Sequence, residues 1–333
     1  MDNFNRIHLA VLLSLLIGIT ACSQNDKSPV PGGRVSSNSL PPGMLALSTR
    51  TQWMVNFGYC GEMSFVEVGM YYGQYISQYD ARALASPGVT QTSYDSQLLL
   101  GFNDNVAAQA MKLRASRWTG TGGTNFLAWI KQNIAKNFPV IVGMQMQDGK
   151  YPDYDHIVPI HGVRSNHAIV DPSYYPDDVL VFDDLGVNGG NQIFSEAFGS
   201  ILGKSAGLLY FFDPQVNYGT AILGVADTNG DTLPVQVVTS INIENPPIQG
   251  TSRPPASPLT ITATVSNLRV GVAYVLYRYN DLSVVPSSQF NATASKAIRS
   301  WNIMLTSGSQ FSVSEEIMSS DMAIYRAVKA TAP

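Results

Sequence analysis

The stretch Gly58-Tyr59-Cys60-Gly61-Glu62 heads a segment whose apolar and aromatic residues recur at helical spacing. The spacing predicts a helix over residues 60–79. The recurring residues are Phe65, Val68, Tyr72 and Ile76. The partial positive charge of a helix N-terminus lowers the pKa of a thiol placed there. Cys60 is therefore either a small buried side chain or a nucleophile.

The chain's other cysteine, Cys22, closes an apolar leader. Residues 9–19 are apolar but too few to span a bilayer, which takes about 20 residues, so they predict a secretory signal. Thr20-Ala21-Cys22 resembles the lipobox of bacterial lipoproteins. The resemblance implies a signal peptide over 1–22, a lipid on Cys22 and export to the bacterial cell envelope. Ser23 then favours the outer membrane of a Gram-negative cell. An ordinary signal cleaved nearby is the alternative.

The composition is that of a globular protein, with 45% hydrophobic and 13% charged residues and a net charge of −4. No basic stripe is present, which makes nucleic acid a poor candidate partner. Residues 23–44 are rich in Ser, Asn, Pro and Gly, and we expect a flexible tether there. The remaining length is enough for two domains.

Residues 45–214 show helix signals first and consecutive strand signals afterwards, which predicts an α+β domain. The further expected helices cover 105–116 and 125–137, and the expected strands cover 140–144, 156–163, 179–182 and 208–212. Residues 215–333 show mostly strand signals, at 235–243, 259–266, 272–279, 311–314 and 323–328. Apolar residues alternate strictly with threonines over 259–266. We therefore expect an immunoglobulin-like β-sandwich over 215–333.

A thiol nucleophile needs a base, normally a histidine, and the base needs an orienting acceptor. His156 opens the expected strand and His161 lies five residues further on. On an unbroken strand they face opposite ways, so only one can point at Cys60, although Pro159 could bulge the strand. His167 falls in a polar stretch that indicates a loop.

These landmarks resemble papain-like cysteine peptidases, in particular the branch that trims double-glycine leaders from bacteriocins. A Cys-Gly pair begins a helix, Pro139 precedes a buried strand, a strand runs from His156 to Gly162, and the next strand ends at Asp183-Asp184. The resemblance covers residues 45–214. It implies that Cys60 is the nucleophile, His156 the base and Asp184 the orienting residue, with Asp183 as the rival for that role.

Two positions depart from the family pattern. Glu62 stands where the family usually has proline. The family's oxyanion-hole glutamine lies about six residues before the cysteine, whereas Gln52 lies eight before Cys60 and Asn56 four before it. Either amide, or the backbone N–H of Cys60, could donate to a developing oxyanion.

The expected function is that of a lipid-anchored cysteine peptidase or amidase, a hydrolase that cleaves a peptide or amide bond through an acyl-thioester on Cys60. Transfer of the acyl group to an amine, as in transpeptidation, would use the same residues. The alternative is a catalytically silent papain-like scaffold that serves as a cell-surface binding or adhesion lipoprotein. The expected partners are a peptide or protein substrate, the membrane through the lipid alone, and a cell-wall or surface partner for the sandwich.

We expect neither a cofactor nor a metal. One free cysteine and scattered histidines lack the spacing of a zinc site. The segment 227–232 is similar to a calcium loop, but Thr232 and Val238 occupy the positions that need glycine and glutamate. A turn is the better interpretation of that segment.

Overall fold

The computed structural model describes residues 40–147, 154–188, 193–248 and 253–331. The predicted signal peptide with Cys22, and residues 23–39 of the predicted tether, lie outside these ranges. Helices and mostly antiparallel strands combine in the described residues, so the α+β class is confirmed. No helix among the described residues is both long enough and apolar enough to cross a bilayer.

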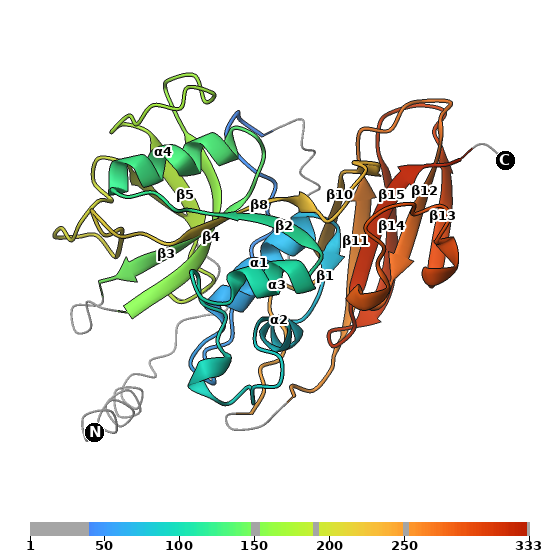
Figure 1. Ribbon diagram of the computed structural model, residues 1–333, viewed down its shortest axis with the longest axis horizontal. Coiled ribbons are helices and arrows are strands. Elements are labelled where there is room, and N and C mark those ends of the chain that lie inside the picture. The colour runs from blue at the N-terminus through green and yellow to red at the C-terminus, as the bar shows by residue number, and fades with distance from the viewer. Residues whose placement is uncertain (1–39, 148–153, 189–192, 249–252, 332–333) are drawn as a thin grey trace, which may run out of the picture. The chain divides into compact units, whose positions relative to one another are not determined.

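A seven-stranded antiparallel sheet carries the candidate site (Figure 1). Its strands follow the order β2-β8-β3-β4-β5-β6, and β7 pairs with β3. Their bounds are Leu113–Arg117 (β2), Val140–Met146 (β3), Tyr154–Arg164 (β4), Val179–Asp183 (β5), Ile193–Ala197 (β6), Tyr210–Phe211 (β7) and Gly219–Val225 (β8). The expected strands at 140, 156, 179 and 208 all lie in this sheet.

Two helices cover opposite faces of this sheet. Side chains of a strand alternate between its faces. Ile141 of β3 belongs to one buried cluster together with Phe65 of α1 (Cys60–Tyr71). Val140 and Val142 belong to a second cluster together with Phe126 of α4 (Gly123–Ile134). The sheet thus separates the helix that carries Cys60 from α4.

The C-terminal strands form two antiparallel sheets. One has the order β1-β15-β12-β13 with β9 paired to β15, and the other has the order β10-β11-β14. Their bounds are Gln74–Tyr75 (β1), Thr232–Leu233 (β9), Val235–Thr239 (β10), Pro258–Val265 (β11), Ala273–Tyr279 (β12), Arg299–Met304 (β13), Phe311–Met318 (β14) and Ala323–Lys329 (β15). Leu259, Ile261, Ala263 and Val265 are all buried, which confirms the alternation expected for that strand.

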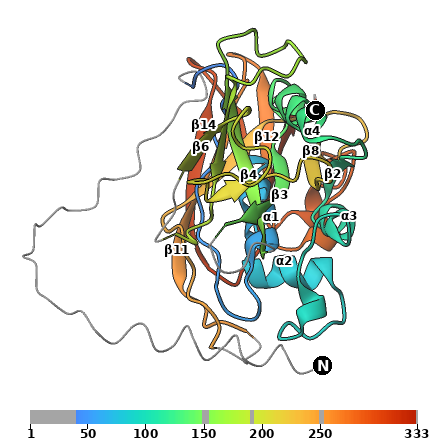
Figure 2. The ribbon, with the colours of Figure 1, turned by 90° about the vertical axis from the view of Figure 1, so that its left-hand side faces the viewer.

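The predicted helices at 60–79 and 105–116 are wrong in their second halves. The first ends at Tyr71, and Gly73 follows with a φ of +75° that favours glycine. β1 then pairs with β15, and α2 (Gln78–Ala85) begins after the capping residue Ser77. The second helix, α3 (Asp104–Ala110), gives way to β2, which pairs with β8. α2 packs against both α1 and α3 (Figure 2).

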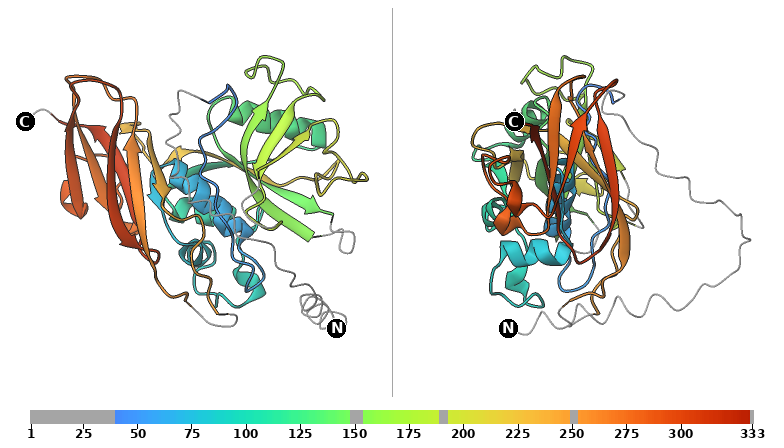
Figure 3. Two further views of the ribbon diagram at one scale, coloured as in Figure 1. Left: turned by 180° about the vertical axis from the view of Figure 1, so that it is seen from behind. Right: turned by 90° about the vertical axis from the view of Figure 1, so that its right-hand side faces the viewer.

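Two strands join a sheet of the other half of the chain, across the boundary expected at residue 214. β8 follows that boundary and nevertheless joins the seven-stranded sheet, between β2 and β3. β1 precedes the boundary and joins the sheet of β15. Figure 3 shows α1 between the two groups of strands, and its Phe65 and Val68 share one buried cluster with Val235 and Val237 of β10. The described residues accordingly belong to one compact unit.

Candidate active site

Cys60 is the first residue of α1 and is partly exposed. The turn before it is tight, because Asn56, Phe57 and Gly58 all have a positive φ, of 50°, 71° and 84°. Burial of the sulfur raises the pKa of the Cys60 thiol to about 11, although the backbone N–H of Ile157 acts in the opposite direction. The resting thiol is therefore protonated at neutral pH, and a nucleophilic role would require a base.

The side chain of Arg82 supports this turn through hydrogen bonds to its backbone carbonyls. Its side chain is fully buried, and its Nε donates to Glu62 at 2.6 Å. Nη1 donates to the carbonyl of Asn56 at 2.8 Å, and Nη2 donates to the carbonyl of Gly58. The guanidinium also lies over the Tyr59 ring, 3.5 Å from its centroid. Glu62, where the family pattern has proline, is thus half of a buried ion pair that supports the turn before Cys60.

His156 is fully buried in β4, and its ring is oriented by a backbone carbonyl. Its Nε2 lies 2.9 Å from the carbonyl oxygen of Asp184, which can only accept, so Nε2 carries the proton. Burial lowers the pKa of His156 to about 4, and the ring is therefore neutral. Its Nδ1 holds the free lone pair and has no hydrogen-bond partner among the described residues. The imidazole is in the tautomer that can accept a proton at Nδ1.

Asp184 contacts the imidazole through its backbone and not through its carboxylate. The carboxylate accepts from the backbone N–H groups of Gly186 and Asn188, at 3.0 and 3.2 Å, and closes the turn after β5. It also accepts from the Tyr210 hydroxyl at 3.3 Å. The Tyr210 ring stacks on His156 with 5.8 Å between the centroids. Turn and tyrosine together fix the carbonyl that holds the histidine.

The sulfur of Cys60 and the imidazole of His156 are not hydrogen-bonded, and they lie on opposite faces of the sheet. The backbone N–H that interacts with the sulfur belongs to Ile157, the residue after His156. Ile157 belongs to the cluster on the α1 face of the sheet, whereas Tyr210 belongs to the cluster on the α4 face. Within the described ranges, no hydrogen bond joins the Cys60 sulfur to either ring nitrogen of His156.

Gln52 places an amide beside the N-terminus of α1. Its Oε1 accepts from the backbone N–H of Tyr59 at 3.2 Å, and its own backbone N–H donates to Leu185. Its Nε2 is buried and without a partner in the part of the chain that the structure describes. The Asn56 side chain instead interacts with the Tyr59 phenol. Of the two amides considered for an oxyanion hole, that of Gln52 contacts the backbone N–H of Tyr59, the residue before Cys60.

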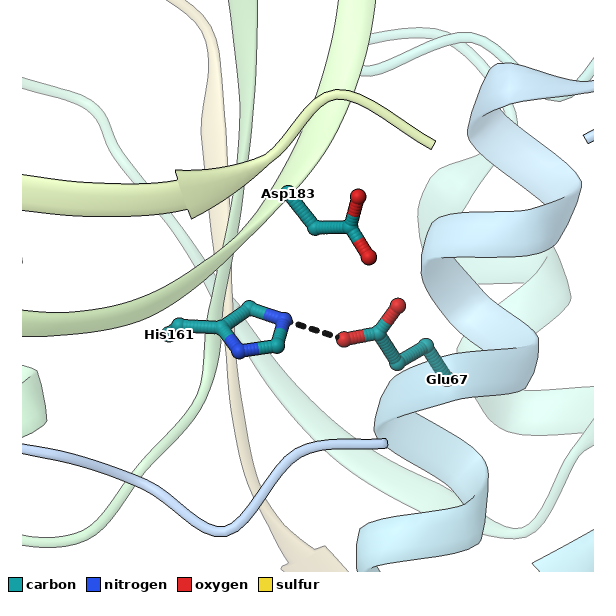
Figure 4. A group of neighbouring side chains, drawn as sticks. All are labelled: Glu67, His161 and Asp183. Carbon is teal, nitrogen blue, oxygen red and sulfur yellow. Dashed lines mark hydrogen bonds and ion pairs between the residues drawn. The ribbon is translucent and has the colours of Figure 1, made fainter. Parts of the chain in front are cut away.

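His161 and Asp183 lie together elsewhere, in a buried group with Glu67 (Figure 4). His161 Nε2 is 2.5 Å from Glu67 Oε1, so its ring is engaged two turns along α1 from Cys60. Asp183, the rival for orienting His156, accepts from the backbone N–H of Leu185. Sequence reasoning missed Glu67. Its position seven residues after Cys60, on the same helix face, is the signal that could have found it.

The calcium-like segment is a turn. The carboxylate of Asp227 accepts from the backbone N–H groups of Asn229, Gly230 and Thr232, at 3.2, 3.1 and 2.7 Å. These bonds are made within the segment itself, as in an Asx-type turn.

No known protein family, curated protein or solved structure matches the chain. The chemistry of the site is therefore the basis for any function assigned to it.

Proposed function

We propose that this protein is a cysteine peptidase or amidase with Cys60 as its nucleophile, His156 as its base and Gln52 as its oxyanion donor. The observation that carries the proposal is the neutral imidazole of His156, whose Nε2–H is held by the Asp184 carbonyl and whose Nδ1 is unpartnered among the described residues. A histidine held in this tautomer can take a thiol proton. The Cys60 sulfur interacts with the backbone N–H of Ile157, the residue after His156 on β4.

The reaction would proceed through an acyl-thioester. As the sulfur attacks the carbonyl carbon of the substrate, Nδ1 of His156 takes the thiol proton and the carbonyl oxygen becomes an oxyanion. The backbone N–H of Cys60 and Nε2 of Gln52 would donate to that oxyanion. The proton then passes from His156 to the leaving amine, and water attacks the thioester to release the acid and regenerate the thiol. An amine in place of water would give acyl transfer.

The raised pKa of the resting thiol means that the proposed mechanism needs the proton to leave the sulfur only during attack. Burial holds the Cys60 pKa near 11 and the His156 pKa near 4, so both groups are neutral at pH 7. The proton would move as the sulfur attacks, and the proposal requires His156, which now stacks on Tyr210 on the α4 face of the sheet, to reach the sulfur on the α1 face.

The wider assignment belongs to the same proposal. A cysteine at the start of a helix, packed against an antiparallel sheet that carries the histidine, supports a papain-like fold for the first half. The two C-terminal sheets support an immunoglobulin-like sandwich for a cell-wall or surface partner. Cys22 would carry the lipid that anchors the protein to the cell envelope.

Alkylation of Cys60 by iodoacetamide across pH tests the proposal. We expect rapid labelling of the folded protein near neutral pH, strong suppression in His156→Ala, and no change in His167→Ala, a half-exposed histidine. An electrophilic peptide probe that forms a thioether should label the wild type and not Cys60→Ala. Labelling that requires denaturation, with no dependence on His156, would refute the enzyme.

A silent binding scaffold is the second candidate. The observation that favours it is the raised pKa of Cys60 together with the absence, among the described residues, of a hydrogen bond from its sulfur to an imidazole. A polar cavity of 490 Å³ lies away from Cys60, lined in part by Asp80, Arg253 and Arg278. A scaffold would keep its partner in Cys60→Ala, whereas a peptidase would lose all turnover.

A further inference from the structure

Glu67, His161 and Asp183 bring three metal-ligating side chains together from three elements. Glu67 comes from α1, His161 from β4 and Asp183 from the end of β5 (Figure 4). One donor atom of each lies within 4.8 Å of the others. The carboxylates are fully buried and the imidazole is 6% exposed. Two carboxylates and an imidazole are thus held away from water.

Both carboxylates have a buried oxygen without a partner. Neither Oε2 of Glu67 nor Oδ2 of Asp183 accepts a hydrogen bond from any residue that the structure describes. The backbone N–H and the side chain of Arg50 both act on Glu67, but the Arg50 guanidinium is bonded to Glu244. Buried carboxylate oxygens without donors are costly unless a proton or a cation compensates them.

We propose that Glu67, His161 and Asp183 bind one divalent transition-metal ion, with Zn²⁺ as the first candidate. One imidazole nitrogen and two carboxylate oxygens suit Zn²⁺, Co²⁺ or Mn²⁺. Bonds of about 2.0–2.2 Å to one ion require donor atoms roughly 3–4 Å apart, so the present grouping needs only small adjustments. The ion would balance the two negative charges and leave a coordination position for water.

The role of the ion would be to position the candidate catalytic elements. α1 carries Cys60 and Glu67, and β4 carries His156 and His161. Asp183 ends β5 and is followed directly by Asp184, whose carbonyl holds His156. An ion bound by Glu67, His161 and Asp183 would fix the relative positions of Cys60, His156 and Asp184. The binding itself does not depend on whether Cys60 is a nucleophile.

A second grouping supplies a matched comparison. His167, Asp177 and Asp178 also place donor atoms within 4.8 Å of one another. The ammonium of Lys131 lies 2.7 Å from Asp178 Oδ2, however, so a cation already compensates that carboxylate. Asp177 is half exposed, and Asp177→Asn should leave metal binding unchanged.

Metal uptake by the purified protein tests the inference. The protein is stripped with a chelator, refolded with and without Zn²⁺, dialysed and analysed for bound zinc by mass spectrometry. Parallel samples receive Co²⁺, whose visible absorption reports the ligand set. We expect one ion per chain in the wild type and in Asp177→Asn. Glu67→Gln and Asp183→Asn, which keep the side-chain volumes, should lose stoichiometric binding and the cobalt spectrum.

Thermal unfolding with and without zinc supplies a second readout. Zinc should raise the Tm of the wild type and of Asp177→Asn, and should not raise that of Glu67→Gln. No stoichiometric zinc after refolding, or uptake unchanged in both carboxamide variants with native circular dichroism, would overturn the inference. A wild type that binds no zinc, together with a Glu67→Gln variant of equal stability, would also overturn the inference. The carboxyls of Glu67 and Asp183 would then share a proton in place of binding an ion. If Glu67→Gln and Asp183→Asn lose the metal but Cys60 is still labelled by iodoacetamide, the proposed function stands.

Discussion

Replacing Arg82 with methionine tests the buried support beneath the turn before Cys60. The change keeps much of the apolar stem and removes the guanidinium from Glu62, Asn56 and Gly58. Glu62 is 1% exposed and would be left as a buried carboxylate without its counter-charge. Breaking a buried ion pair in this way costs about 3–5 kcal/mol. We expect a loss of that size in the free energy of unfolding.

The assay is urea unfolding followed by circular dichroism at pH 7. Arg253→Met is the control, since Arg253 is 54% exposed and 3.4 Å from Asp80, and an exposed pair of this kind contributes less than about 1 kcal/mol. In the double variant Arg82→Met/Glu62→Gln, removal of the stranded charge should make the total loss smaller than the sum of the single losses. Additive losses, or an Arg82→Met loss no larger than that of Arg253→Met, would refute the reasoning.

Two further predictions concern pH and packing. Burial lowers the pKa of His156 and of His161 to about 4, below their value in the unfolded chain, so the stability they contribute is present above about pH 6.5 and is lost as the pH falls toward 4. In metal-free protein the Asp183 carboxyl has the opposite pH dependence. Burial raises its pKa to about 8, so the stability that Asp183 contributes is lost as the pH rises from about 4 to about 8. Tm measured across pH with a chelator should show the alkaline loss in the wild type and a smaller one in Asp183→Asn; an unchanged loss would contradict the assignment. Gly61→Ala should destabilise the protein by about 1–3 kcal/mol, because a Cβ there would overlap the carbonyl oxygen of Leu98. Gly143→Ala, whose Cβ would meet no atom closer than 3.8 Å, is the control, and equal losses in urea unfolding would refute the packing argument.

The sequence predicted those elements whose signals are local. β4 was predictable because an apolar run follows His156, and β11 because apolar residues alternate with threonines. α1 was predictable at its start, where Cys60 follows a glycine-containing turn, but not at its end. Tyr72 and Ile76 continue the apolar spacing of a helix, yet Gln74 and Tyr75 between them pair with Ile324 and Ala323, some 250 positions later. Backbone pairing at that distance leaves no mark on a local pattern.

The sequence supplies candidate residues for the site but not their contacts. Cys60, His156 and Asp184 occur in an order that a resemblance can use. Which atom of Asp184 would reach the ring depends on the turn that its own carboxylate closes, and that turn is formed with residues 186 and 188. The spacing of Glu67 from Cys60 indicates a shared helix face but not a partner, because His161 comes from a strand 94 positions later. Buried polar groups of this kind are found through tertiary contacts.

The exchange of strands between the two halves makes each half depend on the other for a complete sheet. β1 completes the C-terminal sheet, and β8 sits between β2 and β3 of the other sheet. Synthesis of either half alone would leave bare strand edges, which are templates for self-association. We therefore expect a gene split near residue 214 to give two products that self-associate through these edges, whereas the intact polypeptide covers them.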